Sequence, residues 1–103
     1  MLQQVCNEHF LALVNQPCPL YLPDGSPLPV QVEAVVSRPQ SRLPENTRIP
    51  FNVQLRSLQP TDFVDGLCAL ELPQLGRVEA IFVSREPALG RDPAQGYFNI
   101  IFN

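Results

Sequence analysis

The chain has 103 residues, of which 45% are hydrophobic and 17% are charged. This length fits one domain spanning residues 1–103, and the apolar fraction excludes a disordered tail. The formal net charge is -3 and the chain has no lysine, so it lacks the positive field that attracts phosphate backbones, and we expect no nucleic-acid partner.

Targeting and redox features predict a cytoplasmic chain. No apolar run approaches the ~20 residues of a membrane-spanning helix, so we expect no membrane span. Glu8 and His9 interrupt the first apolar stretch, and no basic residue precedes it, which argues against a signal peptide. Cys6, Cys18 and Cys68 have no paired spacing, so we expect small buried side chains without disulfide bonds.

The first predicted element is a short helix within residues 1–14. Its apolar side chains, among them Val5 and Phe10, repeat at helical spacing, and polar side chains occupy the other side. Pro17 ends the element, because the residue before a proline is pushed out of helical conformation. The chain's 12 prolines disfavour a helical bundle.

A β-hairpin is predicted next, from strands at 18–22 and 28–37. Asp24-Gly25 between them supplies a tight turn, since glycine accepts the positive φ that such turns need. The second strand alternates apolar and polar residues, which is typical of a strand buried on one face.

The longest connection, residues 38–50, is rich in proline and arginine. We expect it to be either a solvated connector or a loop that grips an acidic partner surface through Arg38, Arg42 and Arg48.

Four further strands complete the pattern, at 51–58, 67–73, 76–85 and 97–103. Short strands joined by tight turns favour an antiparallel sheet, and the absence of strand–helix–strand alternation argues against a parallel one. We therefore predict a mainly β fold: a small antiparallel barrel or sandwich of about six strands, with one short N-terminal helix.

The strand at 76–85 is apolar on both predicted faces. Alternation places Val78, Ala80 and Phe82 on one face, and Ile81 and Val83 on the other. A strand covered on both sides lies centrally in a sheet or against a partner, so Ile81 and Val83 are candidate partner-binding residues.

No residue pattern specifies catalysis, a cofactor or a metal. Cys6 lies one helical turn before His9, the single histidine, and the two could touch; no acid is placed to orient His9, so we expect a structural role. Zinc needs four ligands with two short spacings, and the chain offers one such spacing. We expect no enzyme activity, no cofactor and no catalytic residue.

Over roughly the whole chain, including the N-terminal helix with Phe10, the sequence resembles a family of short bacterial proteins of unknown function that end in an aromatic residue, a few further residues and Phe-Asn. The likeness is carried by Ile49-Pro50-Phe51, by Leu75-Gly76 and by the closing Tyr97 to Phe102-Asn103. Asp65-Gly66 stands where Gln-Gly is expected. The resemblance implies accessory proteins encoded beside phage-tail-like collar or fibre proteins, which assemble, cap or chaperone a filamentous structure. It carries no catalytic residue.

Two functions remain open from the sequence. The leading hypothesis is a non-enzymatic interaction module that binds another protein or itself. It would act as an accessory, assembly or structural component of a phage-tail-like or filamentous bacterial assembly, and would be incorporated into an extracellular or tail-like assembly. The alternative is a small-molecule-binding barrel or minor enzyme with an apolar pocket lined by Phe51, Phe82 and Phe98.

Overall fold

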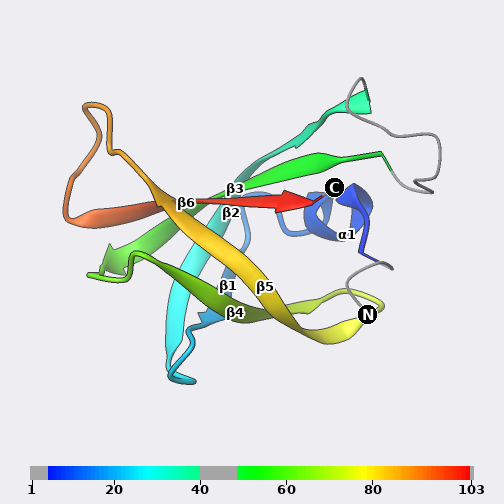
Figure 1. The fold of residues 1–103 in the computed structure, drawn as a ribbon, viewed down its shortest axis with the longest axis horizontal. Coiled ribbons are helices and arrows are strands. Elements are labelled where there is room, and N and C mark those ends of the chain that lie inside the picture. The colour runs from blue at the N-terminus through cyan, green and yellow to red at the C-terminus, as the bar shows by residue number, and fades with distance from the viewer. Residues whose placement is uncertain (1–4, 40–48, 103) are drawn as a thin grey trace.

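The computed structural model describes residues 5–39 and 49–102. This part of the chain folds into one short helix and a β-barrel (Figure 1). The elements, in chain order, are α1 (Asn7–Leu11), β1 (Pro17–Tyr21), β2 (Pro27–Ser37), β3 (Phe51–Pro60), β4 (Asp65–Leu72), β5 (Gly76–Glu86) and β6 (Gln95–Phe102).

The strands close into a barrel in the order β1-β2-β3-β6-β5-β4, and every neighbouring pair is antiparallel. β4, β5 and β6 follow one another as hairpins, and β6 returns beside β3, which is a Greek-key arrangement. The prediction of a mainly β fold is confirmed, and the structure selects the barrel over the sandwich. Closure removes the exposed edges of an open sheet.

Two seams of the barrel are short. Tyr21 of β1 pairs with Ala69 of β4, and β5 pairs with β6 only over Ser84–Glu86. Figure 1 shows β5 and β6 separating beyond that pairing, β6 running towards α1 and β5 towards the β4–β5 turn. The outward side chains next to this separation are therefore not covered by a neighbouring strand.

Helix α1 seals one end of the barrel. The Phe10 ring lies 6.1 Å from the Phe51 ring and 5.6 Å from the Phe102 ring, and the last two stack at 4.7 Å. Burying a phenylalanine contributes about 1.5–3 kcal/mol, and aromatic pairs add to it. Of the predicted 1–14, residues 1–4 lie outside the described residues, and α1 covers only Asn7–Leu11, because Cys6 is extended as its N-cap and turns follow Leu11. These turns lead to Asn15, which has a φ of 63° and donates its N–H to the carbonyl of Val32.

Arg85 and Ser57 hold the opposite end together. The Arg85 guanidinium donates to the carbonyl oxygens of Thr61, Phe63 and Gln95 at 2.9–3.2 Å. The Ser57 hydroxyl accepts from the Gly96 N–H at 2.7 Å and donates to the Gln59 carbonyl at 2.8 Å. Because Ser57 is fully buried, these bonds satisfy backbone groups where β3 and β6 lose their regular register.

A bulge in β5 corrects the predicted faces of that strand. Cys68 pairs with Ile81 and Leu70 pairs with Val78, so Glu79 and Ala80 together oppose a single residue of β4. Ala80 has a φ of 59°. The extra residue reverses the alternation that follows it. The prediction that Val78 shares a face with Ala80 and Phe82 is therefore wrong.

Candidate interaction face

Ten outward side chains on five neighbouring strands form two adjacent rows on the outside of the barrel. We call this surface the low-charge face. It consists of Val36, Asn52, Ile101, Phe82 and Leu67 in the first row, and of Ala34, Gln54, Asn99, Ser84 and Asp65 in the second.

The strand register joins the first row in two groups, one on β4 and β5 and the other on β6, β3 and β2, with the separation of β5 and β6 between them. Leu67 of β4 pairs with Phe82 of β5, Ile101 of β6 pairs with Asn52 of β3, and Asn52 pairs with Val36 of β2. Four of these five side chains are apolar and about half exposed: Leu67 58%, Ile101 56%, Phe82 55% and Val36 47%. Phe82 and Ile101 are the first outward residues beyond the β5–β6 pairing, so they flank the place where the two strands separate.

The second row carries amides and a hydroxyl. Ser84 pairs with Asn99, Asn99 with Gln54, and Gln54 with Ala34. The Asn52 amide donates to the Asn99 Oδ1 at 3.5 Å, which links the two rows. The Asn52 Oδ1 is buried and has no hydrogen-bond partner in the described part of the chain. Of the ten residues only Asp65, at the end of its row, is charged.

Paired charges lie outside the two rows. Arg56 and Glu33 form an ion pair at 3.1 Å beyond the amide row, and Arg77 and Glu79 form one at 3.2 Å on β5. Arg77 also lies 4.6 Å above the Tyr21 ring. An apolar centre with a charged, solvated margin is the anatomy of a protein–protein interface.

A shallow hollow adjoins the face at Leu67. It has a volume of about 170 Å³, and its lining includes Tyr21, Leu67, Arg77 and Ala80. Such a hollow beside an exposed apolar row can receive a side chain of a bound protein.

The predicted partner-binding residues do not form this face. Arg38 donates its guanidinium to the carbonyl of Phe102 at 2.9 Å and its backbone N–H to the carbonyl of Pro50, which ties β2 to the adjoining strands. Arg42 and Arg48 lie outside the described residues. Ile81 and Val83 are 1% and 0% exposed, because the bulge turns them into the barrel. The prediction that they face a partner is therefore wrong.

The predicted ligand pocket is not formed either. Phe51 and Phe98 are buried at 0% and 1% exposure, whereas Phe82 lies on the outside of the barrel. The Phe98 ring packs against Phe63 at 5.6 Å. The prediction of one pocket lined by Phe51, Phe82 and Phe98 is wrong, because side chains fill the interior of a barrel this small.

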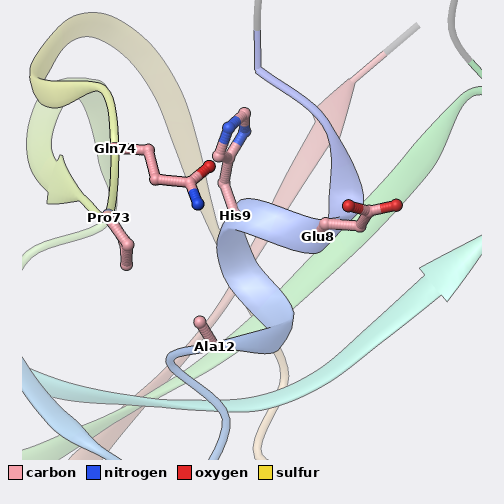
Figure 2. Close-up of a pocket in the computed structure, with 5 residues that line it drawn as sticks. All are labelled: Glu8, His9, Ala12, Pro73 and Gln74. Carbon is pink, nitrogen blue, oxygen red and sulfur yellow. The ribbon is translucent and has the colours of Figure 1, made fainter.

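A hollow of about 180 Å³ lies between α1 and the β4–β5 turn and is lined by Glu8, His9, Ala12, Pro73 and Gln74 (Figure 2). The Gln74 side chain extends towards His9, and the Glu8 carboxylate points away.

Cys6 and His9 touch, at 3.5 Å between Sγ and Nδ1, as their spacing allowed. The Cys6 backbone N–H donates to the same Nδ1 at 3.0 Å, so this nitrogen caps the start of α1. A base needs a free lone pair to accept a proton from a nucleophile. Because the Nδ1 of His9 already accepts from the backbone N–H of Cys6, the contact between these two residues stabilises the start of α1.

Comparisons with known proteins give one family. Residues 5–102 match the family model described as Domain of unknown function (DUF6916). A search of curated proteins and a search of solved structures each found no match. Within the residues that the structure describes, no helix is long and apolar enough to cross a membrane.

Proposed function

The chain belongs to the family described as Domain of unknown function (DUF6916), and we propose, from the surface of its barrel, that it is a non-enzymatic protein-interaction module that binds through its low-charge face. The single observation that carries the proposal is the composition of that face, which has four half-exposed apolar side chains and one charge in ten residues. The outside of a soluble domain normally carries a mixture of charges. Depletion of charge is the compositional mark of an interface centre.

The size of the apolar patch supports the same function. The four side chains at half exposure present on the order of 400 Å² of apolar surface in two neighbouring groups, one on β4 and β5 and the other on β6 and β2, and exposed apolar surface of this order is often a binding site. They lie on strands of a closed barrel and not on loops, so the surface is preformed. A preformed surface binds with little loss of conformational entropy.

For the biological setting we propose an accessory, assembly or structural component of a phage-tail-like or filamentous bacterial assembly. This part rests on the resemblance carried by Ile49-Pro50-Phe51 and by the closing strand. A filled barrel with a preformed outer surface suits a component that is built into a larger particle.

Co-purification tests the proposal. The tagged chain is expressed in the cells that make it naturally, as wild type, as Phe82→Arg and as the control Leu89→Arg. Leu89 is 83% exposed and belongs to the β5–β6 loop, at the end of the barrel opposite α1 (Figure 1). We expect stoichiometric partner chains, untagged copies included, with wild type and Leu89→Arg and their loss with Phe82→Arg. Equal recovery with all three would refute the proposed face.

A further inference from the structure

We infer that the low-charge face is occupied by a second copy of this chain, in a two-fold symmetric dimer whose faces lie on one another. The inference rests on the proposed function of that face and names its partner. In such a dimer each residue meets the same surface from both sides, so the face must be complementary to itself.

Charge is the first argument for self-complementarity. A partner rich in charge would have to leave its charged groups dehydrated and unpaired against this face, which is costly. A second copy brings a face with a single carboxylate, Asp65, at its end. The net charge of -3 makes copies repel one another in general, and the low-charge face is the surface where that repulsion is weakest.

Hydrogen bonding is the second argument. Gln54 and Asn99 pair with each other in the second row, and each amide has both donor and acceptor groups. A row of amides can therefore pair with a copy of itself in the opposite direction.

Area is the third argument. The four apolar side chains of two copies would bury on the order of 800 Å² together, and the amide row and the ion-paired margin bring the total into the range of about 1,200–2,000 Å² for a stable interface. Phe82, the largest apolar side chain of the face, lies on β5 and pairs with Leu67 of β4. Large aromatic side chains are enriched among binding hot spots, so Phe82 is the residue to test.

The bulge of β5 determines which way the copies meet. Strands pair through their edges only where the backbone is regular, and a bulge with a left-handed residue such as Ala80 blunts the edge. The copies therefore associate face to face and not by extending the sheet.

Sedimentation velocity of the purified chain tests this inference, at concentrations from about 1 µM to about 1 mM. We expect wild type and Leu89→Arg to dimerise reversibly, and Phe82→Arg to raise the dissociation constant by roughly 100-fold or more. Because the face lacks charge, we expect added salt to leave the dimer intact, in contrast to a contact made by ion pairs.

Thermal unfolding of Phe82→Arg checks that its monomer is folded; if it is not, Phe82→Ser replaces it. A wild type that stays monomeric throughout, or a dimer that Phe82→Arg leaves unchanged, overturns the second copy as the occupant. If the wild type is monomeric and yet co-purifies a different protein in a Phe82-dependent way, the inference fails and the proposed function stands.

Discussion

Replacing Phe102 by alanine removes the ring that links the last strand to the helix covering the barrel. Phe102 is 6% exposed and touches two other rings, stacking on Phe51 at 4.7 Å and lying 5.6 Å from Phe10. A buried Phe→Ala change costs about 3–5 kcal/mol, from the lost burial and from the cavity that is left. For a domain of this size, 1 kcal/mol lowers the melting temperature by roughly 4–8 °C, so we expect a drop on the order of 20 °C.

The neighbouring residue provides the matched control. Ile101 belongs to the same strand but points outward and is 56% exposed, so Ile101→Ala should change the free energy of unfolding of the monomer by less than about 1 kcal/mol. Both variants are measured by urea unfolding at a concentration where the chain is monomeric. Equal costs for the two, or a cost for Phe102→Ala below about 1 kcal/mol, would refute the sealing of the barrel end by α1 and β6.

Three further predictions concern the barrel and its cysteine. Ser57→Ala should cost about 1–3 kcal/mol, because the buried Gly96 N–H loses its acceptor, whereas Ser84→Ala should cost little; chemical denaturation of both compares them. Gly96→Ala should destabilise by roughly 1–3 kcal/mol or more, since its Cβ would clash with the Phe98 ring; a melting temperature equal to wild type would contradict the packing. Burial raises the pKa of the Cys68 thiol from 9.0 to about 11, so the folded state holds the proton that the unfolded state releases. Stability should therefore be complete below pH 9 and fall as pH rises towards 11. The fall should become smaller in Cys68→Ala, where the Cys18 thiol, whose pKa is also raised by burial, still contributes; a fall of equal size in that variant would exclude the Cys68 thiol as a cause.

The sequence predicts the strands well because alternation and turn residues are local signals. The predicted runs at 28–37, 51–58, 67–73 and 97–103 each overlap an observed strand, and prediction and structure differ by a few residues at their ends. The order of the strands in the barrel depends on contacts between distant residues, which no local pattern records. The choice between barrel and sandwich therefore had to come from the structure.

The face of β5 could not be predicted, because a bulge leaves no reliable trace in a sequence. Strict alternation through Ala80 placed Ile81 and Val83 on the outside of the sheet. The extra residue of the bulge turns these two side chains into the barrel and turns Phe82 to the outside. The outward orientation of Leu67 and Ile101 could have been predicted from alternation, since each lies two residues from another outward residue on its strand. Their meeting with Phe82 and Val36 in one row follows only from the register of five strands.

Photo-crosslinking tests the central claim, that the low-charge face is the surface through which this chain binds protein. A photo-reactive phenylalanine is placed at Phe82 and, in a separate control, at Leu89, and the full chain is irradiated in the cells that make it. We expect discrete protein adducts from position 82, which include the chain's own dimer, and none from position 89. Adducts at 89 alone, or none at 82 while the protein remains folded, would contradict the claim.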